Sequence, residues 1–237
     1  MGFALDFLIK LCPGGRPYYK EILATFGNSI ISYLRLSETS GATAADTSGN
    51  GRTATYTNVS LANTTHLGSP APLLVPASAP GINWYSASLA AAFDPAELAL
   101  MGWAKVSGAG VWTDGAQRDI AYLRADANNY VEIKKRTNNN QFQFEYRAGG
   151  VTNSVIIAWA STDWFHWAIT VSKLNDRMRA YINGAMVGVE QNGLGVWLGA
   201  LGATNVNLGT IGAGLMLWDG WMSNVVLLDR EATGDEL

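Results

Sequence analysis

The chain has 237 residues, of which 48% are hydrophobic and only 15% charged, and its formal net charge at pH 7 is −3. Its longest basic run is residues 134–136, so it lacks the positive field that neutralises phosphates, and we expect no nucleic-acid binding. The length suits one large all-β domain, and the low surface charge favours packing against copies of itself or other subunits.

The chain opens with an apolar stretch, residues 1–15, which we expect to form an N-terminal arm before a domain over residues 16–237. The stretch has no basic start and is interrupted by Asp6 and Lys10, so it is a poor signal peptide and too short to span a bilayer. We therefore expect no membrane insertion. The single cysteine, Cys12, cannot form an internal disulfide. We expect the arm to mediate assembly through Phe3, Leu5, Phe7, Leu8 and Leu11.

A short helix and a first strand are predicted next. Residues 17–26 carry apolar side chains at helical spacing and end at Gly27. In residues 31–37 the side chains alternate between two faces, a period typical of a half-buried strand.

The polar loop that follows, residues 46–51, has the composition of a calcium site. Asp46 and Asn50 supply side-chain oxygens, and Gly49 and Gly51 let the backbone turn its carbonyls toward one point. The other interpretation is that Asp46 caps the loop by accepting hydrogen bonds from the loop's own amides. Both interpretations stay open at this point.

The remainder of the chain predicts short strands separated by turns. Residues 61–83 are expected to be a long surface connection with short extended pieces, residues 90–97 a turn, and residues 191–204 a glycine-rich loop. Asn183 and Gly184 have the composition of a type I′ hairpin turn. The predicted strands are residues 53–60, 98–106, 111–113, 120–124, 130–136, 141–147, 152–159, 164–173, 178–182, 185–190, 206–211 and 221–228. This pattern predicts an all-β fold, a two-sheet antiparallel jelly-roll sandwich with a short N-terminal arm and helix.

Three blocks of the sequence carry a family resemblance. Residues 33–51 contain an aromatic and a leucine, then Glu-Thr-Ser-Gly, a spacer, and Asp-x-Ser-Gly-Asn-Gly; the other blocks are residues 164–184 and 219–237. In this order they resemble laminin-G-like jelly-roll domains of the concanavalin A-like lectin/glucanase superfamily, of the kind found in bacteriophage virion proteins. The resemblance implies the fold but leaves function open, because this fold hosts lectins, glycosidases and structural modules.

The resemblance also bears on the calcium prediction. In the family this loop often binds Ca²⁺ with help from an acidic residue in the closing strand. The matching position here is Ser223 or Asn224, so the resemblance implies a weakened site. Calcium is the one cofactor expected.

We expect no catalytic activity. A glycosidase of this superfamily would carry Glu-x-Asp-x-x-Glu on one strand, with two carboxyl groups about 5 Å apart for a retaining mechanism, and the sequence lacks that pattern. Glu132 and Glu145 are expected to be solvated, outward-facing residues. His66 and His166 are far apart in the sequence and show no zinc spacing, and we expect His166 on a strand surface.

Aromatic residues beside loops are the remaining candidates for a binding site. A sugar ring packs its C–H face on such a side chain while Asn or Asp fixes the hydroxyls. The candidates are Trp112, Tyr130, Trp197 and Trp218. The other interpretation is that they are core or subunit-contact residues.

Two functions follow from these observations. The first is a non-enzymatic structural or attachment protein of a bacteriophage particle, such as a capsid-decoration or tail-fibre component. It would be located in the virion, as a homo-oligomer in contact with other virion subunits. The alternative is an extracellular, lectin-like carbohydrate-binding module that recognises a cell-surface glycan.

Overall fold

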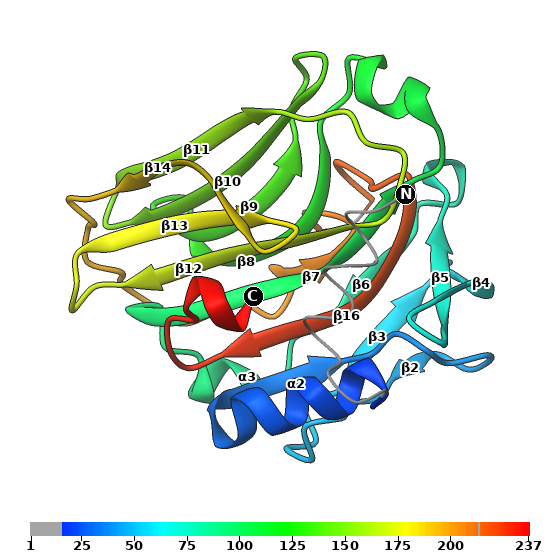
Figure 1. Cartoon of the computed structure of the whole chain (residues 1–237), viewed down its shortest axis with the longest axis horizontal. Coiled ribbons are helices and arrows are strands. Elements are labelled where there is room, and N and C mark those ends of the chain that lie inside the picture. The colour runs from blue at the N-terminus through cyan, green and yellow to red at the C-terminus, as the bar shows by residue number, and fades with distance from the viewer. Residues whose placement is uncertain (1–15, 213) are drawn as a thin grey trace.

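The computed structural model describes residues 16–212 and 214–237, which form two antiparallel sheets packed face to face (Figure 1). The first sheet has the strand order β14-β13-β12-β7-β16-β5-β4, with β1 also paired to β16; the second has the order β11-β10-β9-β8-β15-β6-β3-β2. The predicted all-β sandwich with an N-terminal helix is confirmed. The predicted assembly arm, with Phe3, Leu5, Phe7, Leu8 and Leu11, lies outside the described residues.

The strands are β1 Ile30–Leu34, β2 Thr43–Ala44, β3 Ala54–Thr57, β4 Ser60–His66, β5 Ser69–Leu74, β6 Gly81–Asn83, β7 Glu97–Val106, β8 Arg118–Asp126, β9 Asn129–Lys135, β10 Gln141–Ala148, β11 Val151–Ala158, β12 Phe165–Ser172, β13 Arg177–Ile182, β14 Ala185–Gln191, β15 Val206–Leu208 and β16 Gly220–Leu228. The described helices are α2 Tyr18–Phe26 and α3 Ala87–Ala92. The 3₁₀ turns are Gly27–Ser29, Pro76–Ser78, Ala109–Thr113 and Gly234–Glu236.

The main core lies between the two sheets and follows from the alternation of the strands. In β10, Phe142, Phe144 and Tyr146 point inward and are at most 1% exposed. Each such side chain contributes about 1.5–3 kcal/mol when it is removed from water. The intervening residues of β10 therefore project from the outer face of the second sheet.

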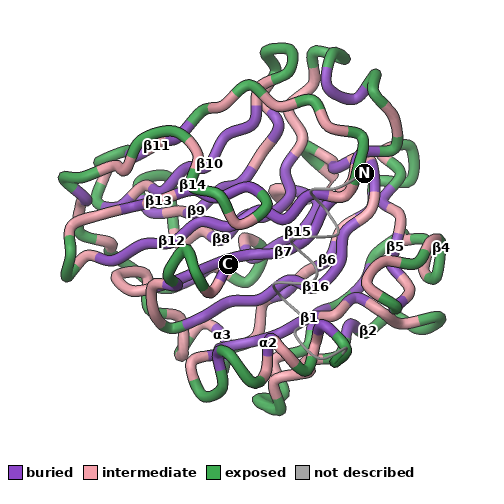
Figure 2. The backbone as a smooth tube through the Cα atoms, viewed as in Figure 1, coloured by how far each residue is buried: buried purple, intermediate pink, exposed green. Residues whose placement is uncertain are grey.

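The outer face of the first sheet is covered by α2. Strand β1 was predicted to be half-buried, but all of its residues are buried (Figure 2). Ile22 and Phe26 of α2 belong to a second apolar cluster with Tyr33 of β1. The prediction was wrong because alternation within one strand cannot show that a helix packs on its outward side.

Three segments differ from the prediction. The expected connection over residues 61–83 contains strand β6 and most of the β4–β5 hairpin, whose turn places Leu67 and Gly68 at φ 52° and 74°. The expected turn at residues 90–97 includes the end of α3, a helix whose start is capped by the Ser86 hydroxyl, which accepts from the Leu89 N–H at 3.0 Å. The expected strand at residues 111–113 is part of a 3₁₀ turn. Among the described residues, no helix is long and apolar enough to cross a membrane.

Candidate functional site

A row of polar side chains crosses the outer face of the second sheet. Asn207 of β15 lies opposite both Asn83 of β6 and Tyr122 of β8. Tyr122 lies opposite Glu132 of β9, which in turn lies opposite Glu145 of β10. Directly opposite residues project from the same face of a sheet. The strand register therefore places these five residues, here called the polar row, side by side.

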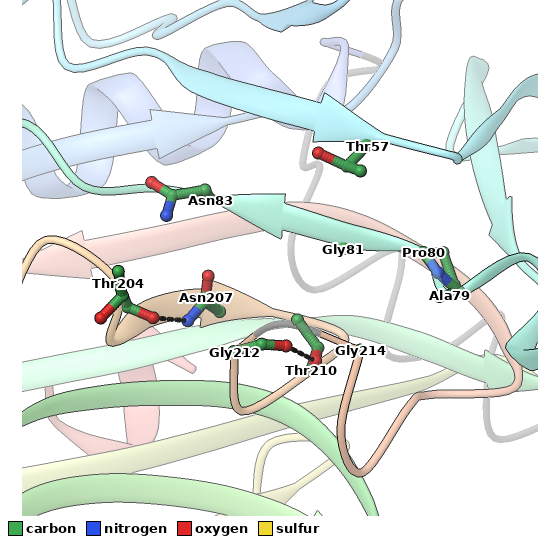
Figure 3. A pocket seen from close by; sticks show the side chains of 10 residues that line it. All are labelled: Thr57, Ala79, Pro80, Gly81, Asn83, Thr204, Asn207, Thr210, Gly212 and Gly214. Carbon is green, nitrogen blue, oxygen red and sulfur yellow. Dashed lines mark hydrogen bonds between the residues drawn. The ribbon is translucent and has the colours of Figure 1, made fainter.

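A pocket with a volume of about 230 Å³ lies at the Asn83 end of the polar row (Figure 3). Its lining is uncharged and consists of Thr57, Ala79, Pro80, Gly81, Asn83, Thr204, Asn207, Thr210, Gly212 and Gly214. A Cβ atom on Gly81 would lie 2.9 Å from Cγ2 of Thr210, so the glycine leaves room that any other residue would fill. The pocket is a shallow site of amides and hydroxyls, here called the amide pocket.

The two asparagines of the amide pocket present unused hydrogen-bonding groups. The Asn207 Nδ2 donates to the carbonyl of Thr204 at 2.8 Å, which turns Oδ1 the other way, toward Asn83 (Figure 3). Within the described part of the chain, that Oδ1 accepts no hydrogen bond. The Asn83 amide donates to Ala203 O at 3.2 Å, while its oxygen accepts from the Tyr85 N–H at 3.0 Å. A fixed acceptor beside a second amide is a suitable arrangement for neighbouring hydroxyl groups.

The other end of the polar row is a network of carboxylates. Glu132 and Glu145 are 6% and 7% exposed, so the prediction that they are solvated was wrong. Lys134 lies between them, paired with Glu132 and 3.5 Å from Oε2 of Glu145. The Gln143 amide donates to Glu145 at 2.6 Å, and the Tyr130 hydroxyl donates to its other oxygen at 2.5 Å. Neighbouring side chains, rather than water, therefore satisfy these carboxylates.

Asp119 completes this network and was not predicted from the sequence. It is fully buried, and burial, together with the charge and hydrogen bond of Glu132, raises its pKa well above the usual range. Its neighbour Gln117 donates from one amide to both Asp119 oxygens, at 3.4 and 3.2 Å, and to Glu132 at 3.1 Å. Burial alone would lower the pKa of Lys134, but the carboxylates of Glu132 and Glu145 raise it. The network thus consists of three acidic side chains and the ammonium group of Lys134.

The four predicted sugar platforms lie in different environments. Trp112 and Trp218 are 1% and 0% exposed and belong to the main core, so the structure corrects their assignment: their faces are covered by protein. Trp197 is half-buried against Phe93, with ring centroids 5.6 Å apart. Tyr130 alone of the four lies beside the polar row, with its ring centroid 6.1 Å from that of Tyr122.

The carboxylate of Asp46 is the centre of the predicted calcium loop. Its Oδ1 accepts from the backbone N–H groups of Tyr33 at 2.9 Å and Ser48 at 3.0 Å, and from the Ser48 hydroxyl at 2.7 Å. Its Oδ2 accepts from the Arg52 N–H at 2.8 Å. Both oxygens are therefore engaged in capping the loop.

The other predicted ligands of this loop also make backbone contacts. The Asn50 amide donates to the carbonyls of Ile30 and Ile31 at 2.8 and 3.1 Å. Gly49 and Gly51 have φ values of 89° and 71°, which glycine adopts without strain. Within residues 16–212 and 214–237, no group of three or more His, Cys, Asp or Glu side chains is placed to hold a metal ion. Calcium binding stays a prediction.

Replacing Asp46 by alanine is expected to lower the free energy of unfolding by about 2–3 kcal/mol, because four hydrogen bonds to one carboxylate are lost. Asp94→Ala is the matched control, since that exposed carboxylate accepts from the Ala96 N–H at 2.9 Å. Urea denaturation measures both. We expect EDTA and added Ca²⁺ to give the same melting temperature for the unaltered protein; a rise with Ca²⁺ would instead show that the loop binds the metal.

The two histidines are brought together on the outer face of the first sheet. His66 stacks on Trp164 at 3.9 Å and lies edge-on to Trp103 at 4.8 Å, while His166 lies 5.4 Å from Trp103. His166 is 1% exposed, so the prediction of a strand-surface residue was wrong. Burial lowers the pKa of each histidine to about 3, and both rings are neutral at physiological pH.

Comparisons with known proteins identify the fold. A family model described as the concanavalin A-like lectin/glucanases superfamily matches residues 80–237. The chain is similar to the binding domain of botulinum neurotoxin serotype D, with 18% identity and a TM-score of 0.66 over 90% of this chain and 50% of that chain. It also resembles the binding domain of Paraclostridial Mosquitocidal Protein 1 (15% identity, TM-score 0.64, 88% of this chain, 51% of that chain). A third similar structure is the Trypanosoma rangeli sialidase, with 14% identity and a TM-score of 0.60 over 88% of this chain and 32% of that chain.

At these identities the structural likeness shows the fold alone. The chain spans about half the length of these two binding-domain structures. A search of curated proteins gives no match.

Proposed function

Because the chain belongs to the concanavalin A-like lectin/glucanase superfamily, we propose that it is a non-enzymatic carbohydrate-binding module that recognises a neutral saccharide at the amide pocket. The observation that carries the proposal is the Asn207 amide, which is held by Thr204 with its oxygen directed into an uncharged pocket. A sugar hydroxyl can donate to that oxygen. The volume, about 230 Å³, lies below the roughly 300–1,000 Å³ typical of larger ligands and suits a single sugar ring.

The rest of the polar row supports the same function. Tyr122 lies directly beside Asn207, and an aromatic ring next to hydrogen-bonding amides is the usual composition of a sugar site. The carboxylates of Glu132 and Glu145 are held by Lys134 and neighbouring donors, which favours a structural role over proton transfer. Two similar structures are named as binding domains, one of botulinum neurotoxin serotype D and one of Paraclostridial Mosquitocidal Protein 1, and this agrees with a role in recognition.

Asn207→Ala is expected to weaken binding of the best-bound neutral glycan by about tenfold, because one hydrogen bond from a buried group is lost. A glycan array identifies that glycan, and isothermal titration calorimetry gives its dissociation constant. Thr57→Ala tests the exposed rim of the amide pocket, with little effect on folding expected.

The matched control is Asn138→Ala, which removes an exposed asparagine from a hairpin turn far along the sequence from the amide pocket. An array without any bound glycan, or equal affinities for the Asn207 and Asn138 variants, would contradict the proposal. Melting temperatures of all variants separate lost binding from lost folding.

Assembly into a phage particle stays a prediction, and the comparisons supply no support for it. One feature is compatible with subunit contacts. Exposed apolar side chains gather on the two neighbouring edge strands and the loop after them, namely Val151, Ile156, Met186, Val189, Val196 and Leu198. Exposed apolar patches often mark interaction surfaces.

A further inference from the structure

A second pocket lies on the opposite side of the sandwich, where α2 begins. Its volume is about 370 Å³. It is lined by Pro17, Tyr18, Tyr19, Arg35, Leu67, Gly68, Ser69 and Asn224. These residues come from the start of α2, the end of β1, the β4–β5 turn and β16. Among the described residues, this lining contains one cation, Arg35, and no carboxylate. We call it the arginine pocket.

Arg35 is held in place by neutral partners. Its Nη2 donates to the hydroxyl of Ser69 at 2.6 Å, and its guanidinium carbon lies 4.2 Å from the centre of the Tyr19 ring. Its Nε is buried and has no hydrogen-bond partner in the part of the chain that the structure describes. No ion pair of Arg35 occurs within the described residues, unlike Arg177 and Arg230, which pair with glutamates at 2.7 and 2.6 Å. A positioned guanidinium without an acid is suited to an anion from outside.

Asn224 adds a second donor whose orientation is fixed. It is 3% exposed, and its Oδ1 accepts from the Tyr33 hydroxyl at 2.5 Å. Burial raises the pKa of Tyr33, so this hydroxyl keeps its proton and acts as the donor. The amide nitrogen of Asn224 is therefore on the other side, and it has no hydrogen-bond partner among the described residues while Asn224 lines the pocket.

The backbone of Asn224 is irregular at this position. It has a φ of 53° where the β16 register is interrupted between Ser223 and Val226. Asparagine is one of the few non-glycine residues that adopt this region readily. The irregularity directs the side chain of Asn224 toward Tyr33 and the arginine pocket.

We propose that the arginine pocket binds the carboxylate of an acidic, sugar-sized ligand. One guanidinium and one amide match the two oxygens of a planar carboxylate. A single positive charge balances one carboxylate, whereas phosphate carries close to two negative charges at neutral pH. The N-terminal end of α2 adds a favourable dipole, and Tyr19 offers an apolar surface to the ring that carries the carboxylate.

The test is calorimetric titration of the full chain with glucuronate at pH 7 and low salt. We expect one bound ligand per chain, weaker binding at high salt because the interaction is ionic, and at least about tenfold weaker binding of the neutral methyl ester. Acetate has the carboxylate without a sugar ring and therefore tests the contribution of the ring. Inorganic phosphate carries more negative charge and tests the preference for a single charge. We expect both to bind more weakly than glucuronate. No binding of glucuronate, equal binding of the ester or acetate, or tighter binding of phosphate would overturn the proposal.

Asn224→Asp is the sharpest variant. The aspartate tolerates a positive φ and can still accept from Tyr33, but it replaces the donor with a negative charge, so we expect at least a tenfold loss of affinity. Arg35→Gln should have the same effect. Lys20→Gln is the matched control, because it removes an exposed cation from α2 that does not line the pocket. Equal affinities in all three variants would contradict the assignment.

The arginine pocket and the amide pocket are tested separately. Asn207→Ala, which is expected to weaken neutral glycan binding, should leave glucuronate binding unchanged, and Asn224→Asp should leave neutral glycan binding unchanged. Loss of glucuronate binding in the Asn207 variant would place the ligand in the amide pocket and overturn the inference.

Discussion

Asp114→Asn is expected to lower the free energy of unfolding by about 2–4 kcal/mol. The ammonium group of Lys135 is completely buried, and it donates to Oδ1 of Asp114 and to the carbonyl of Ala116 at 2.7 and 2.8 Å. Removing the negative charge leaves that ammonium without a counterion, which costs about 3–5 kcal/mol in a fully buried pair. The expected value is lower because the Asp114 carboxylate is itself partly exposed, and water can approach.

The matched variant is Lys135→Met, which keeps the length of the side chain and removes the buried charge. Asp114 would retain Arg118, whose Nη2 lies 2.6 Å from Oδ2. We therefore expect the change in stability to stay below about 1 kcal/mol, because the carboxylate that remains is partly exposed and keeps an ion pair, so no buried charge is left unpaired. Urea denaturation of both variants and of the double variant measures the coupling. If Asp114→Asn and Lys135→Met lowered the stability equally, Asp114 would not stabilise the protein by neutralising the charge of Lys135.

Acidification from pH 7 to pH 5 is expected to destabilise the protein through its histidines. Burial lowers the pKa of His66 and of His166 to about 3, against 6.5 for a free histidine. The unfolded chain therefore takes up protons below pH 6.5 that the folded chain takes up only near pH 3. Each histidine removes about 2 kcal/mol by pH 5, and the stability they contribute is present above pH 6.5 and is lost as the pH falls.

Asp119 changes the stability with pH in the opposite direction, so its contribution has to be measured separately from that of the histidines. Its pKa is raised in the folded state, so the folded chain holds a proton that the unfolded chain releases, and this contribution grows as the pH falls. The variant His66→Phe keeps a ring against Trp164 and removes one titration, and Asp119→Asn removes the opposing one. Urea denaturation between pH 7 and pH 5 should show a shallower slope for His66→Phe and a steeper slope for Asp119→Asn. Identical slopes in all proteins would refute the assignment.

Much of the fold was predictable because local chemistry decides it. The hairpin at Asn183 and Gly184 follows from residues that tolerate positive φ, and both adopt it, at 51° and 75°. The inward row Phe142, Phe144 and Tyr146 follows from a period of two. The errors lie where a neighbour distant in sequence decides the environment. Helix α2 buries the outer side of β1, and no pattern within β1 contains that information.

The candidate site was harder to predict for the same reason. Asn83 and Asn207 become neighbours only through the pairing of β6 with β15, which the sequence does not specify. The predicted aromatics illustrate the opposite problem: Trp112 and Trp218 lie beside turns, but their rings point into the core. The position of a tryptophan relative to a loop does not give the direction of its side chain. That Glu132 and Glu145 lie opposite each other became clear only from the β9–β10 register.

The pairing of β1 with β16 has a consequence for how the chain folds. Ile30 lies opposite Leu228, and β16 also forms the contacts that join β7 to β5. The middle of the first sheet is therefore complete only when the last long strand has been made. Contacts between such distant parts of a chain carry a large loop-closure entropy and slow the folding of β proteins. During synthesis on the ribosome, β1, β5 and β7 therefore cannot be joined into one sheet until residues 220–228 emerge.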